Sequence, residues 1–168
     1  NGYILENLDV YENFLAVAAH EDGVLFYDIS NPSQPEYIYT LGCANAWAVQ
    51  MAPFPDHPNY EFVIHVADHN SIYTVSYMYY NNQHNFSPID NIFLSSGISS
   101  YKDIAFGDGL VYYAKGTDGV DVYQTVGSLS SDGYTFNCTM HVPCYLDTYD
   151  TSVMANRLSA FNGKVAVS

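Results

Sequence analysis

The sequence contains very few basic residues. Only four of its 168 residues are Lys or Arg, against 18 Asp and Glu, so the formal net charge is −14. A protein that binds nucleic acid neutralises phosphates with Lys and Arg, and an anionic membrane surface attracts the same residues. The composition therefore excludes nucleic acid as a partner and disfavours adhesion to anionic lipid. An acidic surface attracts cations or a basic partner, and it also keeps a protein soluble in salty or extracellular fluid.

Long apolar segments and catalytic motifs are also missing. No run approaches the roughly 18 apolar residues of a membrane helix, so we expect no membrane insertion within this segment. The sequence has no Gly-x-Ser-x-Gly motif and no glycine-rich phosphate loop between a strand and a helix. One region contains the residue types of a catalytic triad: His141, Asp147, Asp150 and Ser152. Without a strained turn that exposes a nucleophile, these residue types alone do not indicate a triad. We therefore expect no catalytic residues.

The most informative feature that is present is a repeat of 48 residues. Three segments align in register, each with an apolar run, a polar turn and a second apolar run: Phe14–Ser30, Phe62–Met78 and Leu110–Val126. A period of about 40 to 50 residues that contains strands rather than helices is typical of propeller blades. The sequence therefore predicts an all-β protein built of β-propeller blades, each with four antiparallel strands.

The repeat divides the chain into three blades and the start of a fourth. The expected blades are residues 4–43, 44–97, 98–150 and 151–168, the last of them incomplete. Leu158–Ser168 aligns with Ile104–Ala114 and accounts for only two strands. A closed propeller has typically 4 to 8 blades, and the first residue is Asn1 rather than Met. We therefore expect a piece of a larger propeller whose partners include the rest of its own longer chain.

The first repeat predicts four strands, and the second predicts two inserted loops. The expected strands are Leu8–Tyr11, Phe14–Ala19, Val24–Ile29 and Glu36–Leu41. The expected loops are Ala52–Tyr60 and the polar segment Tyr79–Pro88. Binding function in repeat proteins tends to lie in such loops. The candidate contact residues are Trp47, His57, Tyr79, Tyr80 and His84.

The segment Val24–Leu41 (VLFYDISNPSQPEYIYTL) resembles the LVIVD repeat. Blades of that family combine an apolar-rich strand, Asp, an apolar residue, Ser, an Asn/Asp-Pro-x-x-Pro segment and an outer strand, and Asp28–Pro35 fits this pattern. Phe14–Gly23 fits the family's second strand and turn, whereas the later repeats match only in their strands and turns. The resemblance implies a β-propeller of the kind common on secreted or surface-exposed proteins, and it implies no catalytic residue set.

Cysteines and glycosylation triplets favour an oxidising compartment. Cys138 and Cys144 are candidates for a disulfide, which persists only outside reducing compartments. Two N-glycosylation acceptor triplets begin at Asn85 and Asn137. Together with the scarcity of Lys, these features predict an extracellular or cell-surface protein. Cys43 is left over, and reduced thiols in a cytosolic repeat protein are the alternative.

Metal sites are weaker candidates. On one strand, His65 and His69 would lie about 13 Å apart, which is too far to share a metal. The repeat alignment places a turn at Asp68, and a turn there would bring His65 and His69 closer together. A metal site formed with His57 is therefore an alternative to the interpretation of these residues as ordinary turn histidines. The Asp-Gly hairpin turns resemble calcium loops only in composition. We therefore expect no cofactor, with calcium at a propeller loop as the alternative.

These observations predict a non-catalytic role. The chain is expected to be a scaffold that presents loops to a protein or glycan partner, or that packs in an extracellular assembly. The alternative is a propeller enzyme, a metal-assisted hydrolase or lyase whose site lies in the central channel. That alternative requires acidic or His side chains on the innermost strands, and those strands carry Asp9, Gln50 and Asp103. An intracellular repeat scaffold is a third hypothesis.

Overall fold

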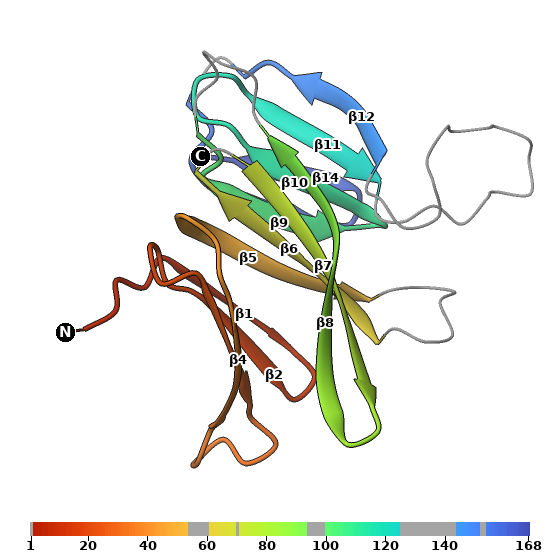
Figure 1. The fold of residues 1–168 in the computed structure, drawn as a ribbon. Coiled ribbons are helices and arrows are strands. Elements are labelled where there is room, and N and C mark those ends of the chain that lie inside the picture. Colours follow the sequence, from red (N-terminus) through yellow and green to blue (C-terminus); the bar gives the residue numbers. More distant parts are fainter. Residues whose placement is uncertain (1, 54–60, 70, 94–99, 125–143, 152–153) are drawn as a thin grey trace, which may run out of the picture.

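The computed structural model describes residues 2–53, 61–69, 71–93, 100–124, 144–151 and 154–168. Within these ranges the chain forms β-strands and no helix, so the described part offers no helix that could span a membrane. The strands form three four-stranded antiparallel sheets and one two-stranded sheet (Figure 1). The predicted all-β class, with sheets of four antiparallel strands, is therefore confirmed.

Sheet 1 contains β1 (Asn7–Tyr11), β2 (Phe14–Ala18), β3 (Val24–Asp28) and β4 (Glu36–Leu41) in sequential order. These bounds confirm the predicted strands to within one residue at each end. The turn between β2 and β3 ends at Gly23, whose φ of 82° suits glycine better than any other residue. Alternation in β1, short apolar runs in β2 and β3, and a glycine at the required φ therefore favour this sheet locally.

Sheet 2 contains β5 (Ala46–Pro53), β6 (Phe62–Asp68), β7 (Ser71–Tyr80) and β8 (Gln83–Phe93). The prediction of a polar loop at Tyr79–Pro88 is wrong, because these residues form the two arms and the turn of one long hairpin. Asn81 and Asn82 make the turn with φ of 53° and 59°, and Asn is among the few residues that tolerate this conformation. The predicted loop at Ala52–Tyr60 is wrong in its first two residues, since β5 extends to Pro53, and the rest of that loop lies outside the described residues.

Sheet 3 contains β9 (Asp103–Gly107), β10 (Leu110–Ala114), β11 (Val120–Gln124) and β12 (Cys144–Tyr149). The two-stranded sheet contains β13 (Leu158–Phe161) and β14 (Lys164–Val167). The 48-residue repeat places equivalent residues on equivalent strands. Leu15, Val63 and Val111 lie on the second strand of each four-stranded sheet, and Val24, Ile72 and Val120 lie on the third.

Successive sheets pack face to face, and the core lies between them. Between sheets 1 and 2, the ring of Phe62 lies 4.5 Å from that of Tyr77 and 5.1 Å from that of Phe14. Between sheets 2 and 3, Ala48, Ala67, Ile72, Tyr113 and Tyr123 form a second buried cluster. Removing one such large apolar side chain from water contributes about 1.5–3 kcal/mol. Burial of these side chains between stacked sheets therefore stabilises the fold, and a single sheet could not bury them alone.

The first strands of the sheets lie side by side and are joined by side-chain hydrogen bonds. β1 contacts β5, β5 contacts β9, and β9 contacts β13. Asp9 Oδ2 accepts from the Met51 backbone N–H at 2.6 Å, and Asp103 Oδ2 accepts from the Leu158 backbone N–H at 2.8 Å. Asp9 therefore connects sheet 1 to sheet 2, and Asp103 connects sheet 3 to the two-stranded sheet.

Candidate functional site

The structure separates the predicted contact residues into two groups at opposite ends of sheet 2. Trp47 lies at the end where Ala46 pairs with Asp68. Tyr79, Tyr80 and His84 lie at the tip of the β7–β8 hairpin. His57 lies outside the described residues. The predicted residues therefore do not form one site.

Trp47 is a packing residue at the junction of three sheets. Its half-buried ring lies 5.6 Å from that of His20 and 6.5 Å from that of His69, and Lys102 Nζ lies 4.4 Å above it. A register shift between Ala46 and Ala48 allows the side chain to turn into this position. Trp47 is half-buried rather than fully exposed, and its role as a contact residue stays a prediction.

A polar cleft of about 260 Å³ lies between sheets 1 and 2 at the opposite end. Two of the predicted contact residues, Tyr79 and His84, belong to it, whereas Tyr80 does not line it. The complete lining is Asn13, Phe14, Asp28, Ser30, Glu61, Tyr77, Tyr79 and His84. The cleft is therefore built from the β1–β2 turn and the end of β3 on one side, and from β7, β8 and the residue before β6 on the other.

The wall from sheet 1 presents the carboxylate of Asp28. Its Oδ1 accepts from the Ser30 backbone N–H at 2.7 Å and from the Ser30 hydroxyl at 2.5 Å. These two hydrogen bonds hold the pKa of Asp28 below its usual value, so the group carries its charge at neutral pH. Local turn chemistry thus fixes the orientation of an acidic group at the mouth of the cleft.

The wall from sheet 2 presents Glu61, Tyr77 and His84. Glu61 Oε1 accepts from the Tyr79 backbone N–H at 3.2 Å. The Tyr77 hydroxyl and His84 Nδ1 lie 2.8 Å apart. Burial, and then the negative charge of Glu61, raise the pKa of the Tyr77 hydroxyl, which therefore stays protonated. A neutral tyrosine thus positions the exposed histidine ring.

The cleft has a negative electrostatic character. Asp28 and Glu61 approach from its two walls, and the first basic residue in the sequence is Lys102, which precedes sheet 3. Sheets 1 and 2 therefore contain no Lys or Arg within their strands. The ring of Tyr79 is 49% exposed beside these carboxylates. Such an arrangement suits a cationic group, or hydroxyl groups that donate hydrogen bonds to carboxylates.

The acidic residues of the innermost strands have structural partners. Asp9 Oδ2 also accepts from Gln50 Nε2 at 2.9 Å, in addition to the Met51 amide. Asp103 binds the Leu158 amide and lies 4.0 Å from Arg157. The residues that the enzyme alternative places in a channel therefore connect neighbouring sheets.

The histidine pair of the sequence analysis does not come together. His65 is fully buried and its Nδ1 lies 3.0 Å from the hydroxyl of Tyr113, whereas His69 packs against Trp47. Among the described residues, no group of three His, Cys, Asp or Glu side chains is arranged to hold a metal ion.

The modification candidates are described only in part. Asn85 lies half-buried on β8, where its Nδ2 donates to the Gln83 carbonyl at 2.9 Å. Asn137 and Cys138 lie outside the described residues, and Cys144 begins β12. Cys43 is a free, half-buried cysteine.

Sequence reasoning missed Asp28, Glu61 and Tyr77 as site residues. Asp28 belongs to the LVIVD-like motif, which carries no site by itself, and nothing in the sequence around Glu61 indicates a site. The lining residues come from segments about 50 residues apart in the chain, so only the stacking of two sheets brings them together.

No family model and no curated protein matches the sequence. The fold is similar to that of two solved structures of computationally designed proteins. The designed Ika4 protein matches with a TM-score of 0.60 and 11% identity, over 98% of this chain and 84% of that one. The designed Ika8 protein matches with a TM-score of 0.54 and 11% identity, over 96% of this chain, which spans 54% of the Ika8 chain. At this identity the likeness concerns the fold alone.

Proposed function

We propose that the chain is part of an extracellular β-propeller that serves as a non-catalytic scaffold, and that the polar cleft between sheets 1 and 2 contacts a protein or glycan partner. The observation that carries the proposal is the cleft itself. It combines two carboxylates, a histidine, a serine and an exposed tyrosine ring in about 260 Å³. Ligand sites commonly combine a concave surface with a few convergent polar groups.

The arrangement of the sheets supports the propeller. Three of the sheets are sequential four-stranded meanders, and the first strands of all four sheets lie next to one another, as those of propeller blades do. The outer face of sheet 1 carries a row of apolar side chains that a further blade would cover. Leu8 and Val10 are 63% and 51% exposed there. The LVIVD-like segment contributes Asp28 to the cleft, so the motif and the proposed contact site coincide.

The extracellular location is part of the same proposal. It rests on the acceptor triplets at Asn85 and Asn137, the spacing of Cys138 and Cys144, and the net charge of −14. The enzyme alternative has less support, because Asp9 and Asp103 bind backbone amides of the next sheet. Calcium at a propeller loop stays a prediction, because backbone carbonyls as well as carboxylates hold that ion.

The partner is expected to offer basic or hydroxyl groups. A Lys or Arg side chain would compensate the charges of Asp28 and Glu61 and lie against the ring of Tyr79, while sugar hydroxyls would donate to the same carboxylates. Either partner class uses the same atoms of the cleft.

Two neighbouring tyrosines provide a matched test. Tyr79 and Tyr80 are adjacent on β7, so their side chains point to opposite faces, and only Tyr79 lines the cleft. The wild-type chain is applied to a glycan array and to an array of basic peptides, and the best ligand is then titrated against Tyr79→Ala and Tyr80→Ala. We expect Tyr79→Ala to weaken binding about tenfold, as the loss of one aromatic contact of about 1.4 kcal/mol predicts. Equal effects of the two variants, or no ligand on either array, would contradict the proposal.

A further inference from the structure

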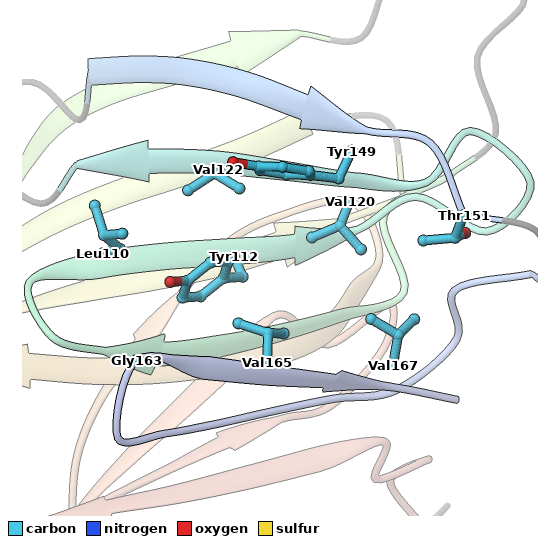
Figure 2. Close-up of a pocket in the computed structure, with 9 residues that line it drawn as sticks. All are labelled: Leu110, Tyr112, Val120, Val122, Tyr149, Thr151, Gly163, Val165 and Val167. Atoms are coloured by element: carbon cyan, nitrogen blue, oxygen red, sulfur yellow. The ribbon is translucent and has the colours of Figure 1, made fainter.

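The polar cleft differs in chemistry from an apolar groove elsewhere between the sheets. That groove, of about 330 Å³, lies between sheet 3 and the two-stranded sheet, and none of its lining residues is charged. Figure 2 shows Val165 and Val167 of β14 on one side of it, opposite Tyr112. The polar cleft between sheets 1 and 2 instead contains Asp28 and Glu61. Negative charge is therefore a property of the polar cleft and not of every hollow between these sheets.

Each carboxylate of the polar cleft is held through one oxygen atom. Both hydrogen bonds from Ser30 go to Oδ1 of Asp28. The backbone N–H of Tyr79 donates to Oε1 of Glu61. The second oxygen of each group, Oδ2 of Asp28 and Oε2 of Glu61, is therefore available to a ligand. One of these two acceptors belongs to the wall from sheet 1 and the other to the wall from sheet 2.

The dimensions of the cleft suit a small organic cation rather than a metal ion. Among the residues that the structure describes, no three His, Cys, Asp or Glu side chains are arranged to hold a metal ion, so Asp28, Glu61 and His84 do not surround a single point. The volume of about 260 Å³ is smaller than the roughly 300–1,000 Å³ of clefts that enclose a drug-sized ligand. The space therefore fits one side chain that extends from wall to wall.

Charge favours a cation over a neutral sugar. The strands of sheets 1 and 2 contain no Lys or Arg, so no basic residue of these strands compensates Asp28 and Glu61. A sugar hydroxyl would donate to a carboxylate, but it would cover two negative charges without compensating either of them. Removing a charge from water is costly unless a charge of opposite sign accompanies it. A cationic ligand is therefore the better match.

The placement of the acceptors favours a guanidinium group over an ammonium group. A guanidinium group is planar, carries five N–H donors in a fixed arrangement and stacks on aromatic rings, whereas an ammonium group is a compact point charge. Its separate edges can donate to oxygens on opposite walls while its face lies against the ring of Tyr79, which is 49% exposed. Phe14 and Tyr77 line the same cleft and supply apolar surface for an aliphatic stem.

We propose that the polar cleft binds the side chain of an arginine residue in a partner protein. Oδ2 of Asp28 and Oε2 of Glu61 accept hydrogen bonds from its guanidinium group, and the ring of Tyr79 lies against the face of that group. The inference rests on the proposed function of the cleft and narrows its partner to a protein that presents arginine. A lysine-bearing protein and a glycan become outcomes of the test.

Three short peptides that differ in one side chain test the choice of arginine. The isotope-labelled chain is titrated with acetyl-Gly-Arg-Gly amide and with the same peptide carrying lysine or citrulline, and the NMR signals of the Tyr79 and His84 amides are followed. Citrulline keeps the shape of arginine and has no charge. One side chain of this size predicts a Kd of about 1 mM for the arginine peptide. We expect the lysine peptide to bind at least several-fold more weakly and the citrulline peptide not to saturate.

Variants of equal charge test whether the two carboxylates are the acceptors. Asp28→Asn and Glu61→Gln each remove one negative charge and keep the anchoring oxygen. The control Glu21→Gln removes the same charge from an exposed residue in the β2–β3 turn, at the end of sheet 1 that is remote from the cleft. Each cleft variant is expected to weaken the arginine peptide about tenfold, and the control is expected to bind it as the unmodified chain does. An equal loss in all three variants would mean attraction to the net charge and would overturn the site.

The outcomes separate this inference from the proposed function. Equal binding of the arginine peptide and either of the other two peptides would overturn the arginine assignment. So would the absence of saturable binding at about 20 mM arginine peptide, well above the expected Kd. A glycan whose binding requires Tyr79, without binding of the arginine peptide, would overturn the assignment and leave the cleft as a contact site. If no ligand depends on Tyr79, the proposed function fails as well.

Discussion

Nδ1 of His65 lies 3.0 Å from the hydroxyl of Tyr113, and the two residues are one repeat of 48 positions apart. Both side chains are fully buried between sheets 2 and 3. Repeat-equivalent positions on β6 and β10 thus form a polar contact across the sheet interface. The ring Nε2 of His65 has no hydrogen-bond partner among the described residues, so the contact with Tyr113 is its principal polar contact.

Burial makes His65 a source of acid sensitivity. It lowers the pKa of His65 from 6.5 to about 3. The unfolded chain therefore binds a proton near pH 6.5 that the folded chain does not bind until about pH 3, so stability falls as the pH falls through this window. The maximum slope is about 1.4 kcal/mol per pH unit. In urea unfolding, wild type should lose about 2 kcal/mol more than His65→Gln between pH 7 and pH 5. Parallel losses in the two proteins would show that His65 does not cause the sensitivity.

Asp9 is expected to stabilise the contact between sheets 1 and 2, because its Oδ2 atom accepts two hydrogen bonds from sheet 2. Asp9→Ala leaves the Met51 amide and the Gln50 side chain without their acceptor, which should cost about 1–3 kcal/mol. Burial raises the pKa of Asp9, so the charge itself is unfavourable there, and Asp9→Asn should cost less because it keeps an acceptor oxygen. Urea unfolding measures both, with the exposed Glu21→Ala as the control. A larger loss in Asp9→Asn than in Asp9→Ala would contradict this account.

Substitution of two glycines with positive φ distinguishes the cost of backbone strain from the cost of a steric collision. Gly109 has a φ of 75° and open space where a Cβ would lie, so Gly109→Ala should cost about 1 kcal/mol. Gly23 has a φ of 82°, and an added Cβ would collide with the carbonyl oxygen of Leu41 on β4. Gly23→Ala should therefore cost more than about 3 kcal/mol. Thermal unfolding of the two variants tests the difference, and equal melting temperatures would exclude the collision.

The thiol of Cys43 should be unreactive in the folded protein. Burial, and then the negative charge of Asp68, raise its pKa to about 12. Because the thiolate is the reactive form, alkylation at pH 8 should be about 1,000-fold slower than for a thiol with the ordinary pKa of 9.0. Mass spectrometry of the peptide that contains Cys43, after iodoacetamide treatment with and without guanidinium, measures this. Rapid labelling without denaturant would mean that the segment opens readily.

Local sequence features predicted much of the strand order. The short, largely apolar runs Phe14–Ala18 and Val24–Asp28, with a glycine-ended turn between them, favour a hairpin without help from the rest of the chain. The same signals failed at Tyr79–Pro88, where polar residues suggested a loop. An outer strand with a solvent-facing side tolerates polar residues, and Asn81 and Asn82 supply the positive φ that the turn requires.

The sequence by itself determined the all-β class, the four-stranded repeat and the equivalence of positions such as His65 and Tyr113, because strand alternation and turn chemistry are local properties. Only the tertiary structure decided which side chains meet. Asp28 and His84 share a cleft, and Trp47 and Lys102 share a contact, because two sheets stack at a particular angle and offset. That angle depends on the fit of many buried side chains at once, including Phe14, Phe62 and Tyr77, and no local pattern encodes it.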